Sequence, residues 1–158
     1  MRKQFFEILL AAMAKDDKII FLTGDLGYGL ADPIKEAYPE RFYNVGAAEQ
    51  VLITAGVGLA LSGKIPVCYS ITPFLLHRPY EAIKLYLQGE QVPVKLVGSG
   101  LDDDYESDGI SHHAFDVDKL LNLTPSIVQY YPNKTDNLDY IVQEMLYNTK
   151  PSFLALRR

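Results

Sequence analysis

Short apolar runs alternate with helix-patterned segments along the whole chain, and this alternation constrains the fold more than any other feature. The runs are rich in β-branched and aromatic residues, which is typical of strands buried on both faces. Helical segments between such strands indicate parallel pairing. The sequence therefore predicts an α/β fold, a mostly parallel sheet with helices on both faces. The predicted strands are 18–23, 65–70, 92–97, 126–130 and 152–156, and the predicted helices are 3–14, 33–38, 48–62, 79–88, 116–122 and 135–148.

The chain has 158 residues and shows no repeat, linker or low-complexity segment, so we expect one domain spanning 1–158. In parallel sheets of this kind, ligands bind beyond the carboxyl ends of the strands. The functional residues are therefore expected in the loops 24–30, 70–78 and 98–113.

Composition excludes several classes of protein. The chain carries 15 Lys and Arg against 20 Asp and Glu, which argues against a nucleic-acid partner because such proteins need a clustered basic face. No apolar run approaches the roughly 20 residues of a membrane span, and the N-terminus leads into an amphipathic segment rather than a signal peptide. The single cysteine, Cys68, lies in an apolar run, which indicates a buried structural thiol and fits the reducing cytoplasm.

The predicted helix 48–62 has no polar face. No charged residue follows Gln50 until Lys64, and a helix that is apolar all round is normally buried all round. Either another chain covers part of it, or it is the central core helix of one subunit. Glu49 lies at its start, where a carboxylate can stabilise the helix N-terminus or, against apolar surroundings, carry out acid–base chemistry.

A longer run connects this helix to a known family. Residues 38–50 read YPERFYNVGAAEQ, which resembles the Y-P-x-R-x-x-N/D-x-G-I-A-E-Q pattern of the transketolase and 1-deoxyxylulose-5-phosphate synthase family of thiamine-diphosphate enzymes. The resemblance covers the whole chain and implies one module of these enzymes, the pyrimidine-binding domain. Its other matching segments are RK at 2–3, TGDL at 23–26, AGVGLA at 55–60, FLLHRPY at 74–80 and DGISHH at 108–113.

The resemblance implies roles for residues beside the cofactor. Glu49 matches the glutamate that hydrogen-bonds N1′ of the aminopyrimidine and favours the imino tautomer, whose nitrogen removes the thiazolium C2 proton. Phe74 is the candidate for the aromatic ring stacked on the pyrimidine, while transketolase-like spacing points instead to Thr72 and Leu75, with Leu75 an aliphatic substitute.

Two further cofactor positions are implied. Asp25 and Leu26 resemble an Asp-Leu pair that lies beside the cofactor in transketolases. The alternative for Asp25 is an aspartate that only caps its own turn.

Three residues are candidates for substrate binding. Arg2 resembles a transketolase arginine that binds the sugar phosphate, but Gly29 stands where its companion serine is expected, so an exposed terminal arginine fits equally well. Arg78 resembles the arginine after the aromatic loop and is either a substrate contact or a helix-entry salt bridge. His112 is implied to be a catalytic and substrate-binding group, because an imidazole with a pKa near 6.5 suits proton transfer.

Other residues of the loop 98–113 receive weaker interpretations. His113 follows His112 directly, but no third ligand has suitable spacing, so we expect no metal site in this chain. The five acidic residues of the loop are expected to form a solvated, mobile face: Asp102, Asp103, Asp104, Glu106 and Asp108.

The family resemblance also shows what the sequence lacks. In these enzymes, Mg²⁺ and the cofactor diphosphate are held by a separate domain with a G-D-G motif and a later asparagine, and this chain has neither that motif nor room for the C-terminal domain. We therefore expect a partner subunit with the diphosphate-binding domain, in a hetero-oligomer such as a heterotetramer, and two-carbon ketol transfer between sugars or sugar phosphates. The alternatives are a non-catalytic scaffold or regulatory subunit, a synthase-like carboligase, and an ordinary nucleotide-binding domain, which the glycine spacing disfavours.

Overall fold

The computed structural model describes residues 1–133 and 136–158 and is built on one six-stranded sheet. The strand order is β2-β1-β3-β4-β6-β5, and every neighbouring pair is parallel. The strands are β1 (Ile19–Thr23), β2 (Phe42–Asn44), β3 (Ile65–Ile71), β4 (Lys95–Ser99), β5 (Val128–Tyr130) and β6 (Ser152–Leu156). The predicted α/β class and parallel sheet are confirmed.

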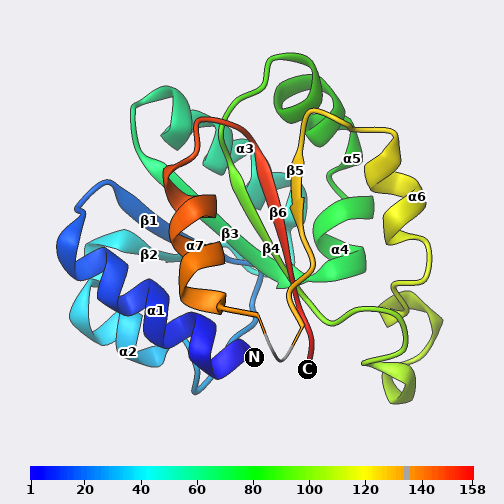
Figure 1. The fold of residues 1–158 in the computed structure, drawn as a ribbon, viewed down its shortest axis with the longest axis horizontal. Coiled ribbons are helices and arrows are strands. Elements are labelled where there is room, and N and C mark those ends of the chain that lie inside the picture. Colours follow the sequence, from blue (N-terminus) through cyan, green and yellow to red (C-terminus); the bar gives the residue numbers. More distant parts are fainter. Residues whose placement is uncertain (134–135) are drawn as a thin grey trace.

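Helices cover both faces of the sheet (Figure 1). One face carries α1 (Arg2–Lys15), α2 (Asp32–Ala37) and α7 (Leu138–Tyr147). The other face carries α3 (Glu49–Leu61), α4 (Thr72–His77), α5 (Tyr80–Ala82) and α6 (Val117–Asn122). A π-helical segment, Ile83–Gly89, continues α5, and short 3₁₀ turns lie at Pro39–Arg41, Glu106–Asp108 and Ile110–His112.

β1, β4 and β6 are buried at every position, and β3 at all but its two end residues, because helices pack on both sides of the sheet. One apolar cluster fills the space below α3, α4 and α6 and includes Leu52, Leu76 and Phe153. The second packs against α1 and α7 and includes Phe5 and Met145. These two clusters fix the sheet, so the loops at its carboxyl edge project from a rigid base.

The free cysteine belongs to the first of these clusters. Cys68 is fully buried on β3, and its Sγ lies 3.5 Å from the carbonyl oxygen of Leu52. Burial raises the pKa of the thiol far above its ordinary value, so the predicted structural role is confirmed.

Several predicted boundaries were wrong. The loop predicted at 70–78 contains α4, which begins at Thr72 with Pro73 in its first turn. Strand β2 was not predicted, and the strand predicted at 92–97 lies at Lys95–Ser99. The helix predicted at 135–148 begins at Leu138, and Thr135 lies outside the described residues.

Helix α3 is not buried on all sides within this chain. Its inner face, with Leu52 and Ile53, is fully buried, whereas Val51 is 52% and Leu61 71% exposed. Gly58 lies on the same outer face, with open space around it. The interpretation as a central core helix is therefore wrong, and one apolar face of α3 stays uncovered by this chain.

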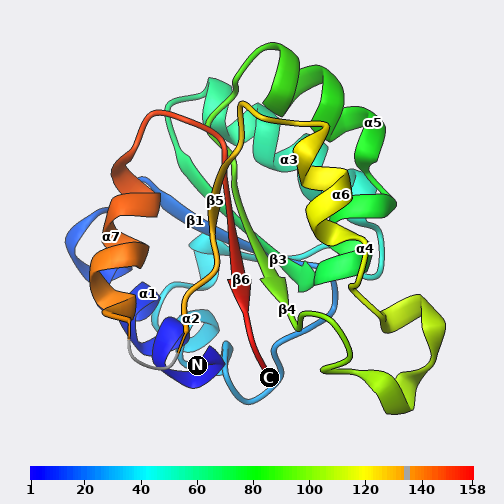
Figure 2. The ribbon, with the colours of Figure 1, turned by 45° about the vertical axis from the view of Figure 1, so that its right-hand side comes forward.

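The segment that follows β4 extends away from the sheet (Figure 2). Both chain ends lie at the end of the molecule to which β3, β4 and β6 point (Figures 1 and 2). Among the described residues, none of the helices is both long enough and apolar enough to cross a membrane.

Candidate active site

A cavity of about 180 Å³ opens where β1 and β3 end and α3 begins. This is the carboxyl edge of the parallel sheet, where ligands bind in such folds. The cavity brings together five predicted site residues, namely Glu49, Phe74, Asp25, Leu26 and Arg78. Gly24, Ala47, Ser70 and Ile71 complete the lining.

Glu49 is the buried acid of this cavity, with 1% of its surface exposed. Ser70 Oγ donates a hydrogen bond of 2.9 Å to Oε1, and Arg78 Nη1 donates one of 2.7 Å to Oε2. No side-chain hydrogen bond caps α3, so the carboxylate faces the cavity instead of capping the helix. The helix-entry salt bridge proposed for Arg78 is present, and its partner is the candidate catalytic acid.

Gly24 provides the close approach that this arrangement needs. A Cβ at this position would lie 3.1 Å from Ser70 Oγ and 3.2 Å from Glu49 Oε1, which is tight for a carbon–oxygen contact. Gly24 therefore avoids a side chain that would crowd Ser70 Oγ and Glu49 Oε1.

An aromatic ring forms the second wall of the cavity. Phe74 lies on α4, and the Arg78 guanidinium carbon is 3.8 Å from the centre of the Phe74 ring. The His112 ring packs edge-on against Phe74, with ring centres 4.8 Å apart. Phe74 thus connects the two predicted polar groups, Arg78 and His112.

The Asp25–Leu26 turn forms the rim. Asp25 has a left-handed φ of +61°, and its carboxylate accepts hydrogen bonds from the Tyr28 hydroxyl and from Asn44 Nδ2. These two bonds, the one from Tyr28 first, hold the pKa of Asp25 below its ordinary value. Leu26 is fixed by Thr23, whose Oγ1 donates to the Leu26 carbonyl and accepts from its amide. Both interpretations of Asp25 are compatible with this turn.

Other predicted residues lie elsewhere. Leu75 is fully buried in the apolar core and does not line the cavity, unlike Phe74, the other candidate for this contact. The reason is local, because on the short helix α4 only Phe74 points toward the cavity while Leu75 points into the sheet. Thr72 is likewise fully buried.

Arg2 lies outside this cavity and reaches the loop 98–113. Its Nη1 donates a hydrogen bond of 3.0 Å to the Tyr105 hydroxyl. That hydroxyl is 2.7 Å from Ser99 Oγ, and the Tyr105 ring centre is 6.3 Å from that of His112. Arg2 is therefore linked to the His112 side of the site through Tyr105.

A second cavity of about 350 Å³ shares Phe74 and Arg78 with the first. His113 lines this second cavity, and its ring packs edge-on against Phe115. Across the described residues, no three His, Cys, Asp or Glu side chains are grouped to hold a metal ion.

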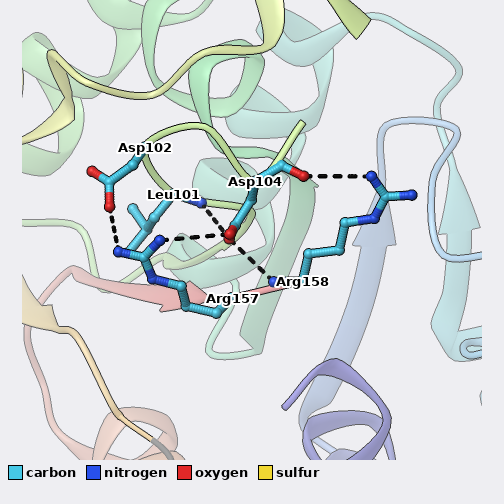
Figure 3. Close-up of polar contacts among 5 residues, drawn as sticks. All are labelled: Leu101, Asp102, Asp104, Arg157 and Arg158. Carbon is cyan, nitrogen blue, oxygen red and sulfur yellow. Dashed lines mark hydrogen bonds and ion pairs between the residues drawn. The ribbon is translucent and has the colours of Figure 1, made fainter. Parts of the chain in front are cut away.

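The acidic loop is less free than its sequence suggests. Arg157 forms ion pairs with Asp102 and Asp104 (Figure 3). Asp104 also accepts from the amides of Leu101 and Arg158. The prediction of a wholly solvated, mobile face is wrong for Asp102 and Asp104, because the end of β6 supplies a cation beside them.

Three contributors were not predicted from the sequence. Ser70 stands at the carboxyl end of a predicted strand, and that position was the available signal for it. Asn44 lies within the family-like run and holds Asp25 through both its amide nitrogen and its oxygen. No sequence pattern pointed to Tyr105 as a site residue, because only the fold brings it to Arg2 and Ser99.

Comparison with known proteins agrees with this geometry. The family model described as "Transketolase, pyrimidine binding domain" matches residues 1–158. The "6-deoxy-6-sulfo-D-fructose transketolase subunit SqwH" of Clostridium sp. (strain MSTE9) is 28% identical over 100% of this chain and 49% of that protein. The "1-deoxy-D-xylulose-5-phosphate synthase" of Thermomicrobium roseum is 35% identical over 97% of this chain and 24% of that protein.

A solved structure is similar as well. "Split gene transketolase, inactive beta4 tetramer" superposes with a TM-score of 0.84 and 26% identity, over 98% of this chain and 50% of that one. The chain spans half or less of the length of these relatives. The chain is a member of the transketolase pyrimidine-binding domain family.

Proposed function

We propose that this chain is the pyrimidine-binding subunit of a split, thiamine-diphosphate-dependent, transketolase-like enzyme. The observation that carries the proposal is the buried carboxylate of Glu49, which faces an aromatic-walled cavity at the carboxyl edge of the sheet. A buried charge is costly and needs partners, and here a serine and an arginine supply them. The burial of Glu49 and its two hydrogen bonds support a chemical role for this chain over a purely scaffolding one.

The residues present fit the aminopyrimidine end of the cofactor. Glu49 would share a proton with a ring nitrogen of the pyrimidine, Phe74 would offer a face for stacking, and Leu26 and Ile71 would supply apolar walls. Gly24 carries no side chain that would crowd the carboxyl group of Glu49. When bound, thiamine diphosphate supplies a nucleophilic carbon for carbonyl chemistry, and the protein supplies position and proton transfer.

The other half of the site is proposed to lie on a partner chain. The sequence has no diphosphate-binding motif, and two relatives are named as transketolase subunits, the SqwH protein and an apulose-4-phosphate transketolase subunit of Actinobacillus succinogenes. The uncovered apolar face of α3 begins beside Glu49, which supports docking next to the cavity. We propose a hetero-oligomer, such as a heterotetramer, in which the partner holds Mg²⁺ and the diphosphate.

The reaction proposed is transfer of a two-carbon ketol unit between sugars or sugar phosphates. His112 contacts Phe74, which supports a role for its imidazole in proton transfer at this site. Arg2 and Arg78 are the cations available to an anionic substrate group on this side, each already engaged, with Tyr105 and Glu49 respectively.

A second reaction class is a synthase-like carboligation. The 35% identity to a 1-deoxy-D-xylulose-5-phosphate synthase is higher than the 28% to the SqwH protein, and the DGISHH run at 108–113 resembles the synthase pattern. Product analysis separates the two classes, because carboligation releases carbon dioxide from a 2-oxo acid and ketol transfer does not.

The test is reconstitution. The chain is mixed with a purified diphosphate-domain chain, thiamine diphosphate and Mg²⁺, and ketol transfer is followed on a panel of free and phosphorylated ketoses. We expect turnover in the mixture and none with either chain alone. Inactivity of the mixture on the whole panel, ketose donors and 2-oxo acids included, would refute the proposal.

A further inference from the structure

Arg78 contacts both the aromatic wall and the acid of the Glu49 cavity. Its guanidinium lies against the Phe74 ring, 3.8 Å from the centre, and donates to Glu49 Oε2 at 2.7 Å. Phe74 and Arg78 are four residues apart, at the third position of α4 and immediately after its end, so helical geometry brings them together on one face. The contact is therefore encoded by a single turn of helix.

A guanidinium and an aminopyrimidine present the same features to these two partners. Each is flat and delocalised, stacks on an aromatic face, and forms a hydrogen bond with a carboxyl group. The ring proposed to stack on Phe74 and the nitrogen proposed to bond Glu49 thus need the two contacts that Arg78 already makes.

The volume of the Glu49 cavity also indicates that Arg78 occupies space that the pyrimidine would need. The Glu49 cavity holds about 180 Å³, below the roughly 300 Å³ at which small-molecule sites usually begin. The neighbouring cavity of about 350 Å³ has Phe74 and Arg78 in its lining too. Withdrawal of the Arg78 side chain, which is 40% exposed and has solvent to move into, joins the two spaces.

We propose that Arg78 is an internal stand-in for the pyrimidine, an autoinhibitory contact that holds Glu49 closed until an aminopyrimidine displaces it. The inference rests on the proposed function and adds a regulatory step to it. Binding then exchanges one partner of Glu49 for another, so the buried carboxylate is never left without a donor. The displaced guanidinium becomes free for an anionic group of the substrate.

The test measures binding of thiamine, the cofactor without its diphosphate, to the chain alone by calorimetry and by line broadening of thiamine proton resonances. Arg78→Met removes the side chain that competes with thiamine for Phe74 and Glu49. We therefore expect this variant to bind thiamine about tenfold more tightly than the parent, which corresponds to about one parent molecule in ten with Arg78 withdrawn. Arg78→Lys keeps the charge without the flat stack and is expected to show a smaller gain. The control Lys84→Met removes an exposed positive charge from the following helical segment and should bind like the parent.

A second readout uses the parent chain and does not depend on a variant folding. The Arg78 Nε–H resonance should move toward the position of a free guanidinium as thiamine is added. An unchanged resonance at saturation, or a folded Arg78→Met that binds no better than the parent, overturns the proposal. If Glu49→Gln still abolishes binding in that case, the proposed function survives. If Glu49→Gln has no effect either, both fail.

Discussion

At the scale of single residues, the Glu49 carboxylate depends on the absence of one side chain. Gly24→Ala would bring a methyl group to 3.2 Å from Oε1 and 3.1 Å from Ser70 Oγ. One of the two side chains must then shift, so we expect thiamine binding to weaken about tenfold while the free energy of unfolding changes by about 1 kcal/mol or less. Calorimetry and urea unfolding measure the two effects. Unchanged binding would show that the carboxylate position is not critical.

Part of the site could be predicted from single residues and part could not. Glu49 and Phe74 were predicted because they lie in family-like runs, and both line the cavity. The pairing of Glu49 with Arg78 joins residues 29 positions apart, and the sequence left substrate contact and salt bridge open for Arg78. Tyr105 meets Arg2 across 103 positions, which no local pattern encodes.

At the scale of elements, α3 contains two glycines in contrasting surroundings. A Cβ on Gly56 would lie 2.8 Å from Cys68 Sγ, whereas a Cβ on Gly58 meets open space. We expect Gly56→Ala to destabilise the chain by about 1–3 kcal/mol through overpacking. Gly58→Ala should stabilise it by about 0.5–1 kcal/mol, because alanine favours the helix.

The Gly58→Ala variant also tests the docking role of α3. If the outer face of α3 packs closely on a partner, Gly58→Ala stabilises the isolated chain but weakens the hetero-oligomer, as analytical ultracentrifugation would measure. Equal association of Gly58→Ala and the parent would exclude close packing at this point of the helix.

A buried lysine links β4 to the end of α7. Lys95 is 1% exposed, and its Nζ donates to the carbonyls of Asn148 and Lys150 and to Asn148 Oδ1. Burial lowers the pKa of Lys95 to about 8, so between pH 8 and the ordinary lysine pKa the unfolded chain binds more protons than the folded one. The free energy of unfolding should therefore rise with pH.

Relative to Lys95→Met, the parent should gain about 1.5 kcal/mol between pH 8 and 9.5. Urea unfolding at both pH values provides the comparison. Only the difference in pH dependence between the two proteins counts, because the substitution also removes three hydrogen bonds. Identical slopes for the two proteins would contradict a lowered pKa.

The elements show where sequence patterns are sufficient. Continuous apolar runs predicted the buried strands β1, β3 and β6 closely. β2 was missed because Phe42–Asn44 is three residues long and mostly exposed. α4 is only six residues long, and it was missed although Pro73 lies in its first turn, where a proline is favourable. In α3 the uniformly apolar sequence held no sign of which face would remain exposed.

At the scale of the whole molecule, the chain folds around one complete core and carries one proposed half of an active site. The sheet is covered on both faces, and one apolar cluster of this chain lies on each. What stays open lies near Glu49, at the cavity and along the outer face of α3. On this proposal, the activity depends on a partner that binds there.

The most direct test of this account is the Glu49→Gln variant in the reconstituted mixture with a diphosphate-domain chain. Gln keeps the shape but cannot take part in proton transfer, so turnover should fall by about 10²–10⁴-fold with unchanged assembly and circular dichroism. The matched control is Glu81→Gln, which removes the negative charge of an exposed side chain on α5. This variant should retain parental activity. Turnover of Glu49→Gln within tenfold of the parent would contradict the central claim.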